Sequence, residues 1–356
     1  MESSFSSLSP QPLFANISTF INNITTDDFT KAYAESMLSK LTSPPIDFPS
    51  LSSFIPFNIL SLNPSLRSLC WKAFCNYYPS SSSSSFTSFF DSQRNIYLLK
   101  KQSILSSSSS SPPSPHITHQ ITEDLSRTRC SLNILQQHPS HSQSETHFQI
   151  LTNILTVFAI VHKDIGYLQG MNEIAFVFYY CFISDDNVYF SHNAEADAFW
   201  CFSNYIVSLR DVYTFTSQGE LGVSERLNNV VQYLQVIDPE LNMYLPNESN
   251  VLNMMMFKWY FVGMCQNFSI DTSMLIFDNI LSEQHDRYLY LEALCVSAVK
   301  VKREEVLNCN HNMEKVMTVL KVFNDEHAEK IMSIVQKTIM KIKEIIAKEN
   351  SAFIIH

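Results

Sequence analysis

A turn that places a glutamine between two glycines is the stretch of this sequence with the clearest chemical potential. Gln169 lies between Gly166 and Gly170, two of only five glycines in the chain, so the turn is expected to serve a purpose. The chain looks helical again from Met171, and a helix start carries unpaired N–H groups and partial positive charge that attract phosphate. An amide held there could orient a water molecule near a phosphate. The alternative is a plain turn between two helices.

An arginine near the end of a short predicted helix is the second candidate. Ile121 faces inward on this helix, while Asp124 and Arg127 stand three residues apart, so the carboxylate can steer the guanidinium. A long cation at the end of a helix can reach outward. The simpler alternative, a surface ion pair, is the usual explanation of this spacing.

Arg67 and Trp71 form a third constellation, because residues four apart are neighbours on one helix face. A guanidinium can lie over an indole ring at this spacing. A structural role, with the tryptophan packed and the arginine bracing a neighbouring segment, is favoured.

The remaining sequence indicates helices packed on helices. Hydrophobic residues make up 45% of the chain and charged residues only 16%, and no segment alternates with period two between hairpin turns. We predict an all-α fold, and the length allows one large core or two packed helical subdomains. Asn63 with Pro64 is typical of a helix start, residues 142–145 form a capping box, and Gly166 is expected to cap the helix that this box begins. Besides the helices flanking the glutamine turn, helices are expected over residues 30–41, 64–77, 86–99, 121–127, 194–211, 225–236, 251–268, 275–281, 288–306 and 326–348.

The predicted domain organisation is an irregular lead-in over residues 1–54 with one short helix, a helical domain over 55–350 and a tail over 351–356. Two serine-rich stretches, 80–85 and 103–115, cannot bury enough apolar surface to order themselves and are expected to be surface loops.

Composition excludes several classes of protein. The net charge of -10 argues against nucleic acid as a partner, and no apolar run is long enough to span a bilayer. The eight cysteines include no Cys-x-x-Cys pair, so no metal site is expected, and they fit the reduced, buried cysteines of a cytosolic protein. No secretory signal is expected at the N-terminus. No Gly-rich phosphate loop is present, so the chain is expected to bind no nucleotide alone.

The three constellations, taken in order, resemble the signature of the TBC domain, the catalytic module of GTPase-activating proteins for Rab GTPases. The family pattern is Arg-x-x-x-Trp, then Ile-x-x-Asp-x-x-Arg, then Tyr-x-Gln-Gly-Met, and the resemblance extends over roughly residues 55–345. The supporting residues of these motifs are Arg67, Trp71, Ile121, Asp124, Tyr167, Gly170, Met171 and Asn172.

This resemblance implies an activator rather than an enzyme. Arg127 matches the arginine finger and Gln169 the glutamine finger that the family inserts into the site of a GTP-bound Rab GTPase in the regulation of vesicle traffic. Mg²⁺ and GTP then belong to the partner, the chain itself has no cofactor, and a cytoplasmic protein would contact membranes indirectly through the Rab. Lys258 and Phe277 depart from the family, which commonly has Arg and Trp there.

Two alternatives stay open. One is a scaffold that binds a Rab without activating it. The other concerns the last helix, where an isoleucine stripe runs beside lysines and could lie on an anionic membrane, although packing against the preceding helices is favoured. The stripe is Ile331, Val335, Ile339, Ile342 and Ile346, and the lysines are Lys330, Lys337, Lys341 and Lys343.

Overall fold

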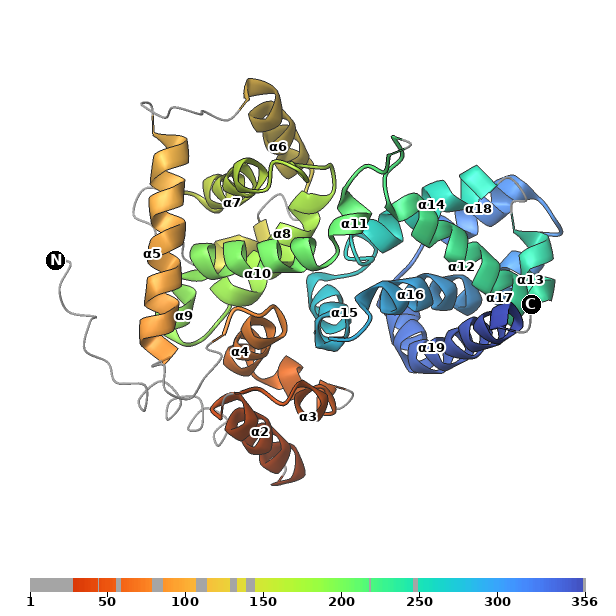
Figure 1. Cartoon of the computed structure of the whole chain (residues 1–356), viewed down its shortest axis with the longest axis horizontal. Coiled ribbons are helices and arrows are strands. Elements are labelled where there is room, and N and C mark those ends of the chain that lie inside the picture. Colours follow the sequence, from red (N-terminus) through yellow and green to blue (C-terminus); the bar gives the residue numbers. More distant parts are fainter. Residues whose placement is uncertain are drawn as a thin grey trace. The chain divides into compact units, whose positions relative to one another are not determined.

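The computed structural model describes residues 28–43, 45–55, 59–78, 86–106, 114–128, 133–138, 145–217, 219–245 and 249–354. Within these ranges the chain is helical throughout, apart from turns and one isolated bridge between Phe215 and Leu221 (Figure 1). The predicted all-α class is therefore confirmed. The chain divides into two compact units, Met1–Ser208 and Leu209–His356.

The first unit is built around three mutually packed helices, α7 (His147–Val161), α8 (Met171–Ile183) and α10 (Ala194–Ser208). Nearly every side chain of α8 is buried, as expected for a helix that is apolar on all sides. Around these three lie α2 (Asp28–Leu41), α3 (Phe48–Ser52), η2 (Ile59–Leu62), α4 (Pro64–Phe74), α5 (Phe86–Leu105), α6 (Pro115–Arg127), η3 (Asn133–Gln137) and α9 (Val188–Ser191).

The second unit is centred on α16 (Arg287–Val301), whose residues 289–299 are all buried. It packs against α12 (Val223–Ile237), α14 (Ser249–Phe261), α15 (Ile270–Ser282) and α19 (Asp325–Ile354). The shorter helices are α11 (Arg210–Tyr213), α13 (Pro239–Tyr244), α17 (Arg303–Leu307) and α18 (Met313–Lys321).

Local sequence signals set several helix boundaries as predicted. The side chain of Asn63 accepts a hydrogen bond from the Leu66 N–H at 2.7 Å and Pro64 opens α4. The predicted N-cap is therefore confirmed. The asparagine side chain satisfies a free N–H of the first turn, and the N–H that proline lacks is one that the helix would not use there.

The start and end of α7 differ from the prediction. The helix begins at His147 with Thr146 as its N-cap, since the carboxylate of Glu145 instead binds Lys101 at 2.7 Å. Residues 142–144 of the predicted capping box lie outside the described residues. At the other end α7 stops at Val161, and Gly166 closes the following turn, its N–H donating to His162 O at 2.8 Å.

Other helix boundaries also differ from the prediction. Helix α5 continues to Leu105, three residues into the predicted loop 103–115. Helix α6 begins at Pro115, six residues before its predicted start at Ile121, because proline suits the first position of a helix. Helix α14 ends at Phe261, where Gly263 and Met264 take positive φ values of 58° and 59°. Helix α19 extends to Ile354, into the predicted tail. The serine tracts themselves, 80–85 and most of 103–115, lie outside the described residues.

Candidate functional site

Asp124 is the centre of a polar network at the end of α6. Its carboxylate is only 4% exposed. One oxygen accepts a hydrogen bond from a residue of the same helix, and the other accepts one from the glutamine turn. Oδ1 accepts from Nη2 of Arg127 at 3.0 Å, and Oδ2 accepts from the Tyr167 hydroxyl at 2.8 Å. The i, i+3 pair expected from sequence is thus present, and the carboxylate also reaches the glutamine turn.

The glutamine turn is held by its own residues and by α6. Gly170 takes a φ of 106°, which favours glycine, and its N–H donates to Oδ1 of Asn172 at 3.1 Å. The amide Nδ2 of Asn172 donates to the Thr128 hydroxyl at 2.9 Å and lies 3.4 Å from the carbonyl oxygen of Asp124. Two segments that are more than 40 residues apart in sequence therefore share one buried set of hydrogen bonds.

The two predicted finger residues stand outside this buried network. The side chain of Arg127 is 65% exposed, and its hydrogen bond to Asp124 is the only one it makes to a described residue. Gln169 is exposed as well, and none of the described residues forms a hydrogen bond with its side chain. Each side chain is free to meet a partner, while the backbone beneath it is fixed.

The electrostatics keep the Tyr167 hydroxyl as a donor. Burial, and then the nearby carboxylate of Asp124, raise the pKa of Tyr167 far above its ordinary value. The phenol therefore stays protonated at any physiological pH and donates to Asp124 without competing for its charge.

The other motif residues are buried and structural. Trp71 has no exposed surface and packs edge-on against Phe178, with ring centroids 5.4 Å apart. Arg67 is 6% exposed and donates to the Ser61 hydroxyl at 3.1 Å. Ile121 and Met171 are fully buried, and Sδ of Met171 lies 3.4 Å from the Leu168 N–H inside the turn.

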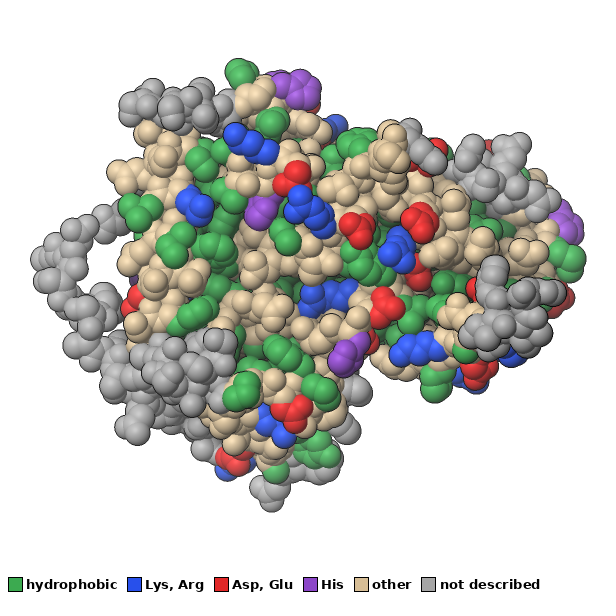
Figure 2. Space-filling model, in the orientation of Figure 1, with side chains coloured by type: hydrophobic (Ala, Val, Ile, Leu, Met, Phe, Trp, Pro, Cys, Tyr) green, Lys and Arg blue, Asp and Glu red, His purple; other side chains and the backbone are tan. Residues whose placement is uncertain are grey.

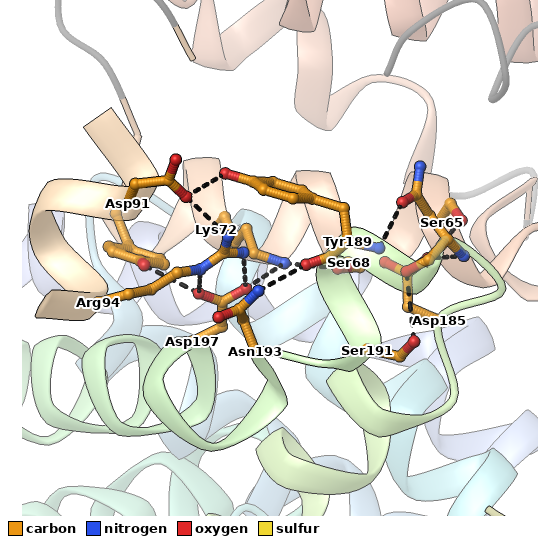
Figure 3. A network of polar contacts seen from close by, with 12 residues as sticks. Ser65, Ser68, Lys72, Asp91, Arg94, Asp185, Tyr189, Ser191, Asn193 and Asp197 are labelled. Carbon is orange, nitrogen blue, oxygen red and sulfur yellow. Dashed lines mark hydrogen bonds and ion pairs between the residues drawn. The ribbon is translucent and has the colours of Figure 1, made fainter. Parts of the chain in front are cut away.

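A second cluster of ionisable groups is buried between α4, α5 and α10 (Figure 3). Asp197, fully buried, accepts two hydrogen bonds from Arg94 at 2.8 and 2.7 Å, and Nζ of Lys72 lies 3.3 Å away. The Tyr77 hydroxyl donates to the same carboxylate at 2.9 Å. Although burial opposes ionisation, Arg94 and Lys72 lower the pKa of Asp197 below its ordinary value. This cluster joins helices and offers no open face, so it is structural.

Asp185 extends this buried cluster toward the start of α4. It accepts hydrogen bonds from the Ser65 hydroxyl and from the Asn187 N–H, the latter at 2.9 Å (Figure 3). Burial raises the pKa of Asp185, although Lys72 offsets part of this effect.

Sequence reasoning missed two parts of this architecture. Thr128 belongs to the network under the fingers, and its position next to Arg127 was the available signal. The Lys72–Arg94–Asp197 cluster joins residues more than 100 positions apart, and only Lys72 within an apolar run hinted at it. Among the described residues, no group of three or more His, Cys, Asp and Glu side chains could hold a metal ion.

Charged side chains of both signs are mixed on the visible surface. On the face shown in Figure 2, lysines and arginines are scattered among acidic and polar side chains. Of the helices within the described residues, none has the length and apolar character needed to cross a membrane.

The two predicted departures from the TBC pattern lie in the second unit. Lys258 is exposed near the end of α14, and Phe277 is fully buried in α15. A side chain at Gly263 would meet the Phe277 ring at 3.2 Å, so this phenylalanine packs tightly against the turn after α14.

Comparisons with known proteins agree with the signature. TBC1 domain family member 13 of Homo sapiens is 29% identical over 164 residues, which cover 46% of this chain and 41% of that protein. The GTPase-activating protein GYP1 of Saccharomyces cerevisiae is 28% identical over 183 residues, covering 46% of this chain and 27% of that protein. These matches thus span less than half the length of either relative.

A solved structure shares the fold. The crystal structure of the Ypt/Rab-GAP domain of Gyp1p superposes with a TM-score of 0.66 and covers 93% of this chain and 99% of that one, at 19% identity. The family profile described as the Rab-GTPase-TBC domain matches residues 64–307, well over half of the chain. The chain therefore belongs to the Rab-GTPase-TBC domain family.

Proposed function

We propose that this chain activates GTP hydrolysis by a Rab-family GTPase, with Arg127 and Gln169 supplied in trans as its two fingers. The observation that carries the proposal is the exposure of both side chains above one buried network. Asp124, Tyr167, Asn172 and Thr128 fix the backbone of both segments, so neither finger needs to be ordered by a distant contact.

Arg127 has the chemistry required at a phosphoryl group in transfer. Charge spreads over the γ-phosphoryl oxygens and the leaving oxygen as the phosphate departs, and a guanidinium stabilises that charge. Its planar donors would meet two oxygens at once. The Asp124 carboxylate occupies only the Nη2 side, which leaves the other donors of Arg127 for phosphate oxygens.

Gln169 would position the attacking water. A carboxamide can accept a hydrogen bond from water and donate one to an oxygen, so it can aim a water molecule at the phosphorus. Mg²⁺ and GTP would come with the Rab, and the chain acts as an activator without a nucleotide site of its own. The seven cysteines in the described part of the chain form no disulfide, in keeping with a cytoplasmic location, and recruitment to membranes would be peripheral, through the Rab.

Single-turnover hydrolysis over a panel of GTP-loaded Rab proteins tests the proposal. Arg127→Ala is expected to lower the stimulated rate by about 10³-fold or more, and Arg127→Lys to restore little of it, because an ammonium cannot make the forked contact. The control is Gln102→Ala, which removes another exposed glutamine, on α5 and outside the network, and is expected to keep the full rate. A folded Arg127→Ala protein with the parent rate would overturn the assignment.

A second part of the experiment tests whether the attacking water is positioned by Gln169 or by the Rab's own glutamine. If Gln169 positions the water, a Rab whose own glutamine is changed to leucine keeps substantial stimulation, whereas Gln169→Ala loses it with the unchanged Rab. Binding of GTP-loaded Rab without any stimulation by the parent protein would instead support a scaffold that binds only.

A further inference from the structure

The last helix of the second unit has two faces of different character. One face of α19 is buried, with Ile331, Val335, Ile339 and Ile342 between 0% and 7% exposed. The predicted packing of this helix on its neighbours is therefore present, and α16 is its main support. The rest of the helix surface does not form part of the core.

Four lysines run along this surface in a straight line, which we name the lysine stripe: Lys330, Lys337, Lys341 and Lys348. Their spacings of seven, four and seven residues keep them within about 40° of one direction around the helix, over a length of about 27 Å. Lys341 is half-buried and the other three are exposed. From residue 330 to 348 the helix carries five lysines and a single acid, Glu344.

A further lysine joins the stripe from α16. The Tyr290 hydroxyl lies 4.0 Å from Sδ of Met332, and the Ser297 hydroxyl donates to Thr338 at 3.1 Å, so α16 and α19 run side by side in parallel (Figure 1). The same register brings Lys300 beside Lys341. Burial, and then the charges of Lys341 and Lys337, lower the pKa of Lys300, although Asp238 offsets part of this effect.

These cations form no ion pair with a described acid, unlike other basic residues of the unit. Lys302 pairs with Glu305 at 3.0 Å and Arg303 with Asp238 at 3.0 Å. Lys300 and the lysine stripe form no ion pair with any acid of the described residues. In a chain with a net charge of -10, such a row of one sign is a local basic surface that can attract an anionic partner.

We propose that the lysine stripe docks the second unit onto an anionic phospholipid surface. Lysines in a row act as separate point charges, which suits a diffuse sheet of headgroups, whereas a specific phosphate site would gather forked arginine donors at one point. Ile334 and Ile345, both half-buried, and Met340, 60% exposed, border the stripe and supply apolar side chains that can enter the headgroup layer. The inference does not rest on activity toward a Rab.

Vesicle flotation of the full chain tests this surface, with phosphatidylcholine vesicles that contain or lack phosphatidylserine. Binding is expected only to the anionic vesicles and is expected to weaken as salt is raised. The triple variant Lys330→Gln/Lys337→Gln/Lys341→Gln is expected to weaken binding by about 100-fold, because each lysine near such a surface contributes about fivefold.

The matched control is Lys315→Gln/Lys321→Gln/Lys343→Gln, which removes three exposed lysines of the same unit, one of them on α19. It changes the net charge equally and is expected to bind like the parent. Equal losses of vesicle binding in both triple variants would show that the net charge, and not the position of the lysine stripe, determines binding. The proposal would be wrong if the parent protein failed to bind phosphatidylserine vesicles. It would also be wrong if the lysine stripe bound soluble polyglutamate but the protein did not bind vesicles. Thermal melting confirms that each variant is folded.

Discussion

The hydroxyl of Tyr167 donates to Oδ2 of Asp124 at 2.8 Å, and with the hydrogen bond from Asn172 to Thr128 this bond links the glutamine turn to the arginine helix. The other oxygen of the same carboxylate holds Arg127. A movement of either segment would therefore be transmitted to the other through one buried side chain. The spacing within each motif is therefore not enough to build the site, because the two motifs must also contact each other.

Tyr167→Phe tests this link. The variant removes only the hydroxyl, and loss of a buried hydrogen bond to a charged group is expected to lower the free energy of unfolding by about 1.5–3 kcal/mol. The rate of stimulated hydrolysis, measured well below the melting temperature, is expected to fall as well because Asp124 loses one of its two fixed donors. Tyr244→Phe is the control: its ring stacks on His311, with centroids 3.9 Å apart, and its hydroxyl has no partner among the described residues.

A parent-like rate for folded Tyr167→Phe would show that the link is structural and does not position the fingers. A loss of rate equal to that in Tyr244→Phe would carry the same meaning.

The buried carboxylate of Asp197 gives a prediction about stability alone. Asp197→Asn leaves the buried cations Lys72 and Arg94 without their counter-charge, and loss of one partner of a buried ion pair is expected to cost about 3–5 kcal/mol. Urea unfolding at neutral pH measures this. Glu304→Gln, which removes an 80% exposed partner of Arg303, is expected to leave the unfolding curve unchanged. Similar curves for both variants would contradict a stabilising role of the buried cluster.

Much of the fold could be predicted because its signals are local. The cap at Asn63, the glycine turn before Met171 and the apolar periodicity of the helices depend only on neighbours within one or two turns. Short helices such as α9 and α13 were missed because four to six residues carry too little periodicity to stand out.

The contacts under the candidate site could not be predicted in the same way. Asp124 and Arg127 are neighbours on one helix, so their pairing follows from spacing. The bond from Tyr167 to Asp124 depends on how α6 packs beside α7 and α8, which no local pattern encodes. The predicted helix start was wrong for a related reason: α7 begins at His147, and Glu145 pairs with Lys101 from another helix.

Gly263 is expected to tolerate no larger residue. Its φ of 58° is strained for an alanine, and an added Cβ would lie 3.0 Å from Cδ1 of Ile280 and 3.2 Å from the Phe277 ring. Gly263→Ala is therefore expected to lower the free energy of unfolding by about 2–3 kcal/mol, from backbone strain and overpacking together. Gly219→Ala has a similar φ of 81° with no atom within 4 Å, and isolates the backbone cost of about 1 kcal/mol. Equal melting temperatures for the two variants would exclude the packing contribution.

Glu292 makes the stability of the second unit depend on pH. Burial raises its pKa from 4.5 to about 7, although Asn229 at 3.2 Å and Arg226 at 3.6 Å oppose this. Between these two values the folded chain holds a proton that the unfolded chain has released, so the free energy of unfolding falls as pH rises from about 4.5 to about 7, by about 3 kcal/mol in total. Glu292→Gln keeps an oxygen for Asn229 and removes the charge. The variant is expected to lose this slope and to exceed the parent in stability at pH 8, as measured by urea unfolding across the range. Glu225→Gln, an exposed change on α12, is expected to retain the slope, and a slope that survives in Glu292→Gln would assign the titration to another group.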